Sequence, residues 1–388
     1  MTCGFPARCG LLLGFVSCVL ILGGCRWPGS QDISLDPTKA YIDAKAELRQ
    51  AAEDPDPFTR SHALEALSHA LGTEAGSLFK EALSDSSPSV QFAAAMAIGD
   101  VQYGPAGPDL VRKAEAEGPD KRVYAAVIYA LHRLGEDKYT GDLVRLLLHP
   151  REPEIRANAA LVMGRMGEPS AIGPLKSLQD DEQSDLVKVN LLEALSLLGD
   201  IRSSQMLEAY ARGPDVNIRL MAIPALGRSG TTDAMLVLEE LLGRQHPPRA
   251  RIAAAIELAK LKRYDRRAYD LCVEAAEVPR RMLGERPVQP GAAVSEVEAY
   301  SLQRLAAMGL GWMHRREAVN VLHPLLKSPD GGVRVAAAMG ILRTLREDES
   351  ARAAGDAEGA AEPSGPRDAA AAIPYKPPRK LHTAGGRD

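Results

Sequence analysis

Side chains that could carry catalysis or bind a metal are few in this sequence, and they form no recognisable motif. The eight histidines are His62, His69, His132, His149, His246, His314, His323 and His382, and none of them is followed by glutamate. The chain therefore contains no His-Glu-x-x-His zinc motif, and it also lacks a haem-attachment motif, a P-loop and a Gly-x-Ser-x-Gly nucleophile elbow. We predict no catalytic residue, no bound metal and no cofactor.

The cysteine at position 25 is the one residue with a chemical role that its neighbours indicate. Residues 11–22 form an apolar stretch of 12 residues, which is too short for a membrane span of about 20 residues but typical of a signal peptide. The stretch leads into Leu22-Gly23-Gly24-Cys25, which resembles the bacterial lipobox. The resemblance implies that the Cys25 sulfur receives a diacylglycerol and that Cys25 becomes the first residue of the mature chain.

A lipidated Cys25 would hold the protein on a membrane surface without a transmembrane helix. Arg26 follows it, rather than the aspartate that retains lipoproteins at the inner membrane. We therefore expect an exported protein, lipid-anchored in the cell envelope, on the periplasmic face of the outer membrane if the host is Gram-negative. An ordinary cleaved signal and an uncleaved N-terminal anchor are the alternatives. Cys272 would then be the single free cysteine, and its apolar neighbours favour a small core residue over a nucleophile.

An internal repeat accounts for most of the remaining chain. The motif begins with an aliphatic residue, continues through paired alanines and ends near a glycine, as in residues 155–164 and 218–227. Copies start at Thr59, Val90, Val123, Ile155, Val187, Ile218, Ala250, Ala299 and Val333. Seven of the eight steps between starts are 31 to 34 residues, and the eighth is 49. A second amphipathic stretch lies between copies, so each unit predicts two antiparallel helices.

One helix pair cannot bury its own apolar face, so consecutive pairs must stack. Small alanines let the helices approach closely, which agrees with an aromatic content of only 4%. At these residues the sequence resembles HEAT repeats of the short type found in phycobilisome lyases. The resemblance implies an all-α solenoid, a superhelix of about nine helix pairs, over residues 37–347.

The other segments of the chain follow from this assignment. Residues 1–24 are the predicted signal peptide and residues 25–36 a linker. Residues 279–296 contain several prolines and form an insertion between the seventh and eighth units. Residues 348–388 are rich in alanine, glycine, proline and charge with few large apolar groups, so we expect a disordered tail.

Cations recur at the eleventh position of the motif, at Arg133, Arg165, Arg228, Lys260 and Arg343. In HEAT proteins the motif helices line the concave side, so the resemblance implies a discontinuous basic ladder there, which is a candidate binding surface. The alternative is a row of solvated helix ends, where cations favour the helix dipole. We interpret the basic second position as structural and paired with acidic residues in the preceding loop, namely Asp185, Asp215 and Asp330.

A second group of cations is a candidate basic patch, defined as Arg263, Arg266, Arg267, Arg280 and Arg281. Anionic lipid, cell-wall polymer or an acidic protein segment would suit it. The whole chain has a net charge of −4, which argues against nucleic acid as a partner.

The lipobox, the repeat array and the missing catalytic motifs together predict a non-enzymatic scaffold or adaptor. It would be monomeric, anchored by lipid in the bacterial cell envelope, and would present its concave face to a protein partner. The alternative is an accessory or regulatory subunit of an envelope enzyme or of an assembly that binds the cell wall or another anionic surface. A third class is an enzyme whose site the sequence does not reveal. Bilin attachment, the activity of the lyases, does not suit an envelope location.

Overall fold

The computed structural model describes residues 35–116, 118, 120–263, 265–283 and 296–359 of the 388-residue chain. The predicted signal peptide, Cys25 and most of the insertion 279–296 lie outside the described residues. Within those residues the regular secondary structure is entirely helical. The prediction of an all-α solenoid is confirmed.

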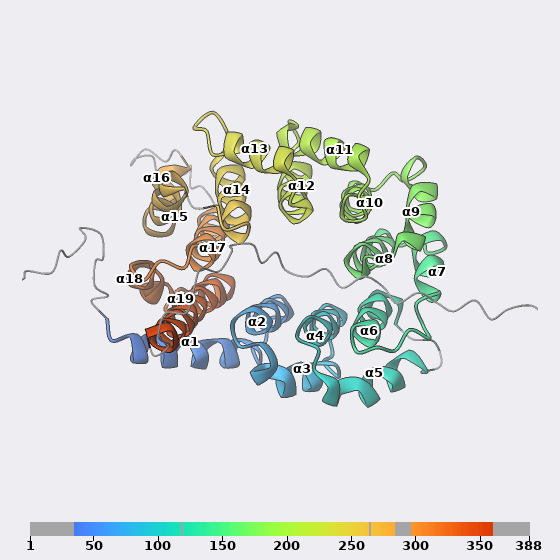
Figure 1. Cartoon of the computed structure of the whole chain (residues 1–388), viewed down its shortest axis with the longest axis horizontal. Coiled ribbons are helices and arrows are strands. Elements are labelled where there is room, and N and C mark those ends of the chain that lie inside the picture. The colour runs from blue at the N-terminus through green and yellow to red at the C-terminus, as the bar shows by residue number, and fades with distance from the viewer. Residues whose placement is uncertain (1–34, 117, 119, 264, 284–295, 360–388) are drawn as a thin grey trace, which may run out of the picture.

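The helices form two concentric layers (Figure 1). The inner layer consists of α2 (Pro57–Ala70), α4 (Pro88–Val101), α6 (Lys121–Arg133), α8 (Pro153–Met166), α10 (Asp185–Leu197), α12 (Val216–Ser229), α14 (Pro248–Lys260), α17 (Glu296–Trp312) and α19 (Gly331–Gly359). The outer layer consists of α1 (Pro37–Ala51), α3 (Gly76–Ala82), α5 (Gly107–Ala114), α7 (Asp142–Leu148), α9 (Ile172–Gln179), α11 (Ile201–Arg212), α13 (Thr232–Leu241), α15 (Arg266–Glu277) and α18 (Ala318–Leu325). Each outer helix therefore precedes its inner partner in the chain.

Short elements join some of these pairs. The 3-10 turns are η1 (Gly72–Ala75), η2 (Gly104–Ala106) and η3 (Pro169–Ala171), and α16 (Pro279–Met282) is a single helical turn at the start of the predicted insertion. The first residues of that insertion are thus helical in the structure.

The inner helices are the motif copies. Each predicted start lies two residues inside its helix, or three in α17. Proline stands in the first turn of α2, α4, α8 and α14, where its missing N–H removes no hydrogen bond. Gly167 and Gly230 end α8 and α12 with φ of 76° and 63°, a conformation that glycine adopts without a steric penalty.

The glycine at the tenth motif position sets the spacing of neighbouring inner helices. A Cβ atom on Gly164 would lie 2.5 Å from the Cα of Ala194, which is the eighth motif residue of the next inner helix. The same relation joins Gly227 to Glu257, where a Cβ would lie 2.6 Å from the Glu257 Cβ. Close packing of backbone against backbone explains how a core with few rings is filled.

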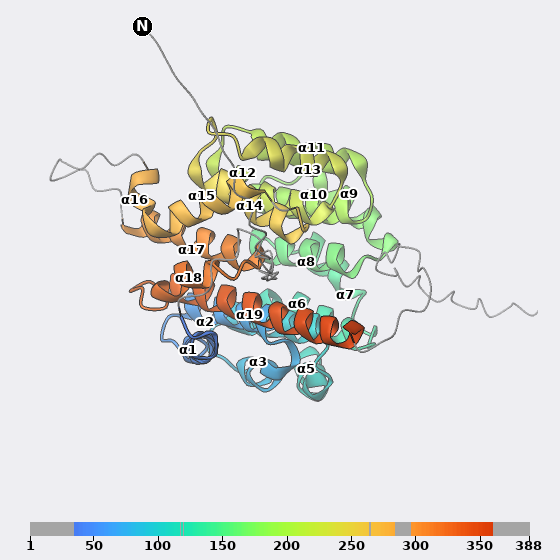
Figure 2. The same ribbon diagram turned by 60° about the vertical axis from the view of Figure 1, so that its left-hand side comes forward.

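The array closes on itself, which the sequence does not predict. The last inner helix, α19, packs against α2 and α1 of the first pair, so the layers form a ring (Figure 1). Figure 2 shows α19 beside α2 from a second direction. The predicted solenoid of nine helix pairs therefore forms a closed ring, because the small rotations between successive repeats add up to a full turn.

At the seam of the ring, where α19 meets the first helix pair, ion pairs join the repeats in the same way as at the internal interfaces. Arg60 pairs with Asp85 at 2.8 Å, and Arg156 pairs with Glu182 at 2.7 Å, each across to the loop that precedes the next inner helix. At the seam Arg334 pairs with Glu47 at 2.7 Å and with Asp54 at 3.5 Å. Asp54 lies three residues before α2, as Asp85 lies three before α4. The first repeat thus follows the last as if the chain were continuous.

Further contacts complete the seam. Arg346 donates to the Ala70 carbonyl at 2.7 Å and to Glu74 at 2.9 Å. His323 Nε2 lies 3.0 Å from Asp43 Oδ2. The seam therefore involves both the inner and the outer layer.

The predicted end of the array at residue 347 is wrong, since α19 continues to Gly359. Residues 348–359, which we assigned to a disordered tail, are helical. They include four alanines and two glutamates, which have high helix propensity. Residues 360–388 lie outside the described residues.

Candidate functional site

Four residues of the predicted ladder, Arg133, Arg165, Arg228 and Lys260, lie in the last turns of inner helices, and Arg343 lies in the middle of α19. His69 of α2 lies within electrostatic range of Asp100, Lys260 and Arg343, which come from three other helices. Arg228 of α12 lies within range of Glu65 on the opposite side of the ring. The inside of the ring therefore holds one shared polar cluster at this end, and not a row of separate, solvated charges.

One part of the cluster joins three successive inner helices. The Asp100 carboxylate accepts hydrogen bonds from the Tyr129 hydroxyl at 2.7 Å and from Arg165 Nη2 at 2.6 Å. The Arg165 guanidinium also lies over the Tyr129 ring, 5.0 Å from its centroid. Burial raises the pKa of Tyr129 to about 12; the charge of Arg165 opposes this rise, and the hydrogen bond to Asp100 adds to it. Arg133 contacts the Gly99 carbonyl at 3.4 Å.

A second part is a line of alternating charges on α10, α12 and α14. Glu193 is buried and accepts two hydrogen bonds from the Arg228 guanidinium. Glu257 is also buried and accepts from Lys260 Nζ at 2.8 Å. Because buried charges must be paired, these carboxylates and cations stabilise each other, and neither cation is available as a free basic group.

The third part surrounds Trp312 near the seam. The Arg343 guanidinium stacks on the Trp312 ring, 3.5 Å from its centroid, and Lys260 Nζ lies 5.5 Å from it. The His69 ring meets the same indole edge-on at 5.7 Å. Surrounding protein atoms lower the pKa of His69, so the imidazole is neutral at neutral pH.

The structure thus brings Arg165, Arg228, Lys260 and Arg343 into one cluster, but it places acidic side chains between them. Sequence reasoning missed Glu193 and Glu257, because they occupy motif positions seven and eight and not eleven. Asp100 does occupy position eleven and interrupts the row of cations. Its charge is the signal that could have identified a mixed cluster.

The second motif position has a structural role, but its partners differ from those we predicted. Arg334 pairs across the seam with Glu47 and Asp54, while Asp330 caps α19 by accepting from the Val333 amide. Arg219 donates to the Gly213 carbonyl, while Asp215 caps α12. Lys188 does lie 3.8 Å from Asp185. The acids in the preceding loop mainly satisfy helix N-termini, which leaves the guanidinium groups to link repeats.

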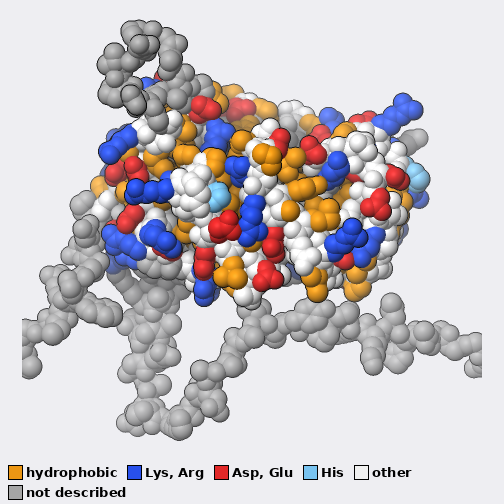
Figure 3. Space-filling model, turned by 90° about the horizontal axis from the view of Figure 1, so that it is seen from above, with side chains coloured by type: hydrophobic (Ala, Val, Ile, Leu, Met, Phe, Trp, Pro, Cys, Tyr) orange, Lys and Arg blue, Asp and Glu red, His pale blue; other side chains and the backbone are white. Residues whose placement is uncertain are grey.

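The residues of the basic patch lie on the outer circumference, at the start of α15, in the loop before it and in α16. All five are exposed, and the side-chain exposures of Arg266 and Arg267 are 69% and 78%. Four have an acidic neighbour, at Glu239, Asp270, Asp265 and Glu296. Elsewhere on the circumference, Figure 3 shows basic and acidic side chains intermingled with apolar ones.

Other chemistry is limited among the residues that the structure describes. No group of three histidine, cysteine or acidic side chains there is arranged to hold a metal ion. Cys272 is buried against α17, where a Cβ on Gly309 would lie 2.8 Å from its sulfur, and burial raises the pKa of the thiol to about 12. No described helix has both the length and the apolar character needed to cross a bilayer.

Comparison with protein families matches residues 35–99 and 108–196 to HEAT repeats. The helix pairs of these two segments match HEAT repeats. The remaining inner helices follow the same sequence motif beyond the matched segments. A search of curated proteins gives no match.

Two solved structures are among those to which this chain is similar. The complex of CpcE and CpcF of phycocyanin lyase from Nostoc is 19% identical, with a TM-score of 0.40, and the match covers 63% of this chain and 96% of that one. Human deoxyhypusine hydroxylase in complex with glycerol is 19% identical, with a TM-score of 0.34 and coverages of 80% and 98%.

The buried carboxyl of Glu257 makes stability depend on pH. Burial raises its pKa, against the opposing effects of Lys260 and Arg228. A carboxyl with a raised pKa contributes stability that is fully present below its unfolded pKa and is lost as pH rises through the folded value. Relative to Glu257→Gln, which cannot ionise, the wild type is expected to lose unfolding free energy as pH rises above the ordinary pKa of a glutamate, about 4.3.

Urea denaturation of both proteins across this pH range measures the difference. The exposed Glu53→Gln variant is the control. A difference between wild type and Glu257→Gln that stays constant or grows with pH would contradict the assignment.

Proposed function

We propose that this protein is a non-enzymatic adaptor, lipid-anchored in the bacterial cell envelope, that binds an acidic protein partner on the outer circumference of the ring. The exposed basic patch carries this proposal, because the ladder cations are already engaged inside the ring. Ion pairs between exposed side chains contribute at most about 1 kcal/mol. An acidic partner can therefore replace Asp265 and Asp270 at little cost.

The position of the anchor relative to the patch supports the same proposal. The linker 25–36 spans at most about 40 Å when fully extended, so a lipidated Cys25 would keep the ring close to the membrane. It leads into α1, which contacts α18, and α18 contacts α15. Helix α18 alone thus separates α1, where the linker ends, from α15, which carries part of the patch (Figure 1). A partner at the patch would be held near the membrane surface.

Replacing Cys25 with serine is expected to abolish acylation, because a hydroxyl does not accept the diacylglycerol. Metabolic labelling with a fatty acid in a bacterial host, followed by membrane fractionation, measures this. Cys9→Ser, which lies before the apolar stretch, is the control and should label like the wild type. Equal labelling and fractionation of Cys25→Ser would contradict the anchor.

Reversing two patch charges, Arg266→Glu with Arg267→Glu, is expected to reduce recovery of the partner by about tenfold or more, since like charges then face an acidic surface. Affinity purification from the native host after crosslinking, with quantitative mass spectrometry, measures the loss. The matched control is Arg112→Glu with Arg145→Glu, two arginines of comparable exposure that also pair with nearby aspartates. Equal recovery with both double variants would reject the patch as the contact.

The same patch favours a second candidate function, an accessory subunit that binds the cell wall or another anionic surface. Cosedimentation of the purified protein with cell-wall polymer or with anionic vesicles separates the two. Salt-sensitive sedimentation that the patch variant loses would favour the second function.

A further inference from the structure

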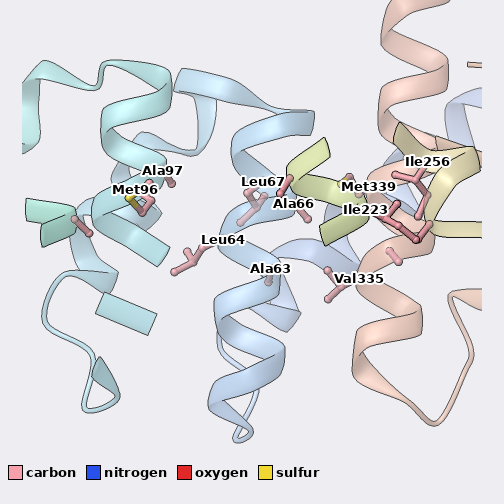
Figure 4. Packing of buried hydrophobic residues seen from close by; sticks show 14 of the residues in the cluster. Ala63, Leu64, Ala66, Leu67, Met96, Ala97, Ile223, Ile256, Val335 and Met339 are labelled. Carbon is pink, nitrogen blue, oxygen red and sulfur yellow. The ribbon is translucent and has the colours of Figure 1, made fainter. Parts of the chain in front are cut away.

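The interior of the ring offers little open space where the first and last repeats meet. Figure 4 shows Val335 and Met339 of α19 facing Ala63 and Ala66 of α2, and all four side chains are buried. The hollow beside them has a water-accessible volume of only about 50 Å³. That space holds a few water molecules at most.

A larger space is a surface groove of about 620 Å³, at the rim of the ring where the inner helices end. We call it the rim groove. It lies between the ends of α6 and α8, the start of α7 and the turn η3. Its volume is in the range typical of ligand sites, about 300–1,000 Å³. Its larger apolar lining residues are Leu143, Val144, Met163, Met166 and Ala171.

The polar part of the rim groove is acidic. Asp137 and Glu168 line it, and both are exposed. His132 Nδ1 lies 2.5 Å from Asp137 Oδ1, while Glu168 forms no salt bridge with any described side chain. No lysine or arginine is among the described residues that line the groove, and the nearby Lys138 is paired with Glu115 at 2.7 Å. The rim groove therefore suits a segment that combines apolar and basic side chains.

The chain itself contains such a segment beyond its last described residue. Residues 373–380 have the sequence Ile-Pro-Tyr-Lys-Pro-Pro-Arg-Lys, with two large apolar side chains, three cations and no acid. We call them the basic tail segment. Proline-rich segments lose little entropy when they dock, because proline already restricts the backbone.

The basic tail segment is long enough to reach the rim groove. Arg343 of α19 belongs to the same polar cluster as Arg165 of α8, which is next to Met166 of the groove. Helix α19 continues from Arg343 to Gly359, a rise of about 24 Å. Inner helices about 10 Å apart form a ring about 30 Å across, which places the groove about 45 Å from Gly359. A chain extended from Gly359 to Tyr375 spans up to about 55 Å.

We propose that the rim groove is the docking site of this chain's own basic tail segment. Ile373 and Tyr375 would lie against the two methionines, whose side chains adapt to irregular apolar surfaces. The three cations would face Asp137 and Glu168. A tether of this length holds the segment at an effective concentration of about 1 mM, so modest affinity suffices. The docked segment would cover the groove, and a basic segment of another protein would have to displace it. The site is independent of the envelope anchor and of the basic patch.

A labelled peptide tests whether the chain's own segment occupies the groove. The probe is a fluorescein-labelled peptide of residues 370–382, titrated with the full chain and followed by anisotropy. Reversing the three cations, with Lys376→Glu, Arg379→Glu and Lys380→Glu, should free the groove. The peptide should then bind this triple variant at least about tenfold more tightly than the wild type. Arg367→Glu with Arg387→Glu, both outside the segment, is the matched control and should bind the peptide as weakly as the wild type.

Substitutions in the groove test where the peptide binds. Added to the triple variant, Asp137→Asn with Glu168→Gln should weaken peptide binding by about tenfold or more, because each removes a charge-assisted interaction. Glu152→Gln with Glu154→Gln, both exposed at the opposite end of α8, should have no effect. Equal loss with both double variants, or no loss with either, would overturn the assignment to the rim groove.

Three further outcomes would overturn docking within one chain. The first is equal affinity of the peptide for the wild type and the triple variant, which would leave the groove open to a segment of another protein. The second is a wild type that dimerises while the triple variant stays monomeric, which would assign the segment to the groove of a second copy. The third is absence of peptide binding to every variant up to about 1 mM.

Discussion

Replacing Arg334 with alanine is expected to destabilise the protein by about 2–3 kcal/mol, as much as the same change at an internal interface. Arg334 bridges the last repeat to Glu47 and Asp54 of the first, and it also donates to the Ser328 and Pro329 carbonyls. Removing the guanidinium leaves a partly buried carboxylate and two carbonyls without their donor. The loss should therefore resemble the loss of a buried ion pair.

Arg156→Ala is the matched comparison, because Arg156 makes the same set of bonds. It pairs with Glu182 and donates to the Pro150 and Arg151 carbonyls. Arg112→Ala, which removes an exposed pair with Asp109, should cost less than about 1 kcal/mol. Urea unfolding of the three variants, followed by circular dichroism, measures the differences.

Comparison of these variants tests whether the ring is closed in solution. If the ring is closed in solution, Arg334→Ala and Arg156→Ala lower the denaturation midpoint by similar amounts. If the ends were apart, Arg334→Ala would behave like Arg112→Ala, and the closed ring would be rejected. Distance measurements between labels at Glu53→Cys and Lys327→Cys, which flank the seam at exposed positions, should show a broader and longer distribution in Arg334→Ala.

Gly164→Ala is expected to destabilise the protein by about 3 kcal/mol, although alanine favours helices over glycine. The added methyl group would lie 2.5 Å from the Cα and 2.8 Å from the Cβ of Ala194. Those atoms belong to helix α10 and cannot rotate away, so α8 and α10 must separate. The spacing set by the tenth motif position would be lost at one interface.

Gly173→Ala is the control for the intrinsic effect of the substitution. Gly173 lies in α9, and a Cβ there would meet no atom within 4 Å. The change should stabilise the protein by about 0.5 kcal/mol, because alanine restricts the unfolded chain. Urea denaturation gives both values. If both variants had the same midpoint, close packing at Gly164 would be excluded.

Local features of the fold could be predicted well from the sequence. The starts of the inner helices follow from the aliphatic first position and the flanking prolines, because these features act within one helical turn. The end of α19 could not be placed, since the helix-forming residues 348–359 have no apolar face that marks where packing stops. The composition of residues 348–359 predicted a disordered tail, but in the structure the helix continues through them because of their local helix propensity.

In the candidate site, too, some residues could be predicted from the repeat and others could not. The recurrence of Arg165, Arg228 and Lys260 is visible in the repeat, but Glu193 and Glu257 become their partners only when neighbouring helices are stacked. His69 and Arg343 lie far apart in the chain, and no spacing rule connects them. The hydrogen bond from Arg343 to the His69 carbonyl requires α2 and α19 to meet.

By itself, the sequence determined the repeat, the helix pairs and the small residues that let them pack closely, because all of these depend on contacts within a unit or between successive units. Closure was decided by the tertiary structure. Whether such an array forms an open superhelix or a ring depends on the rotation from each pair to the next, summed over the nine pairs. Small differences in side-chain size at every interface contribute to that sum, and Arg334, Arg346 and His323 find their partners only where it reaches a full turn.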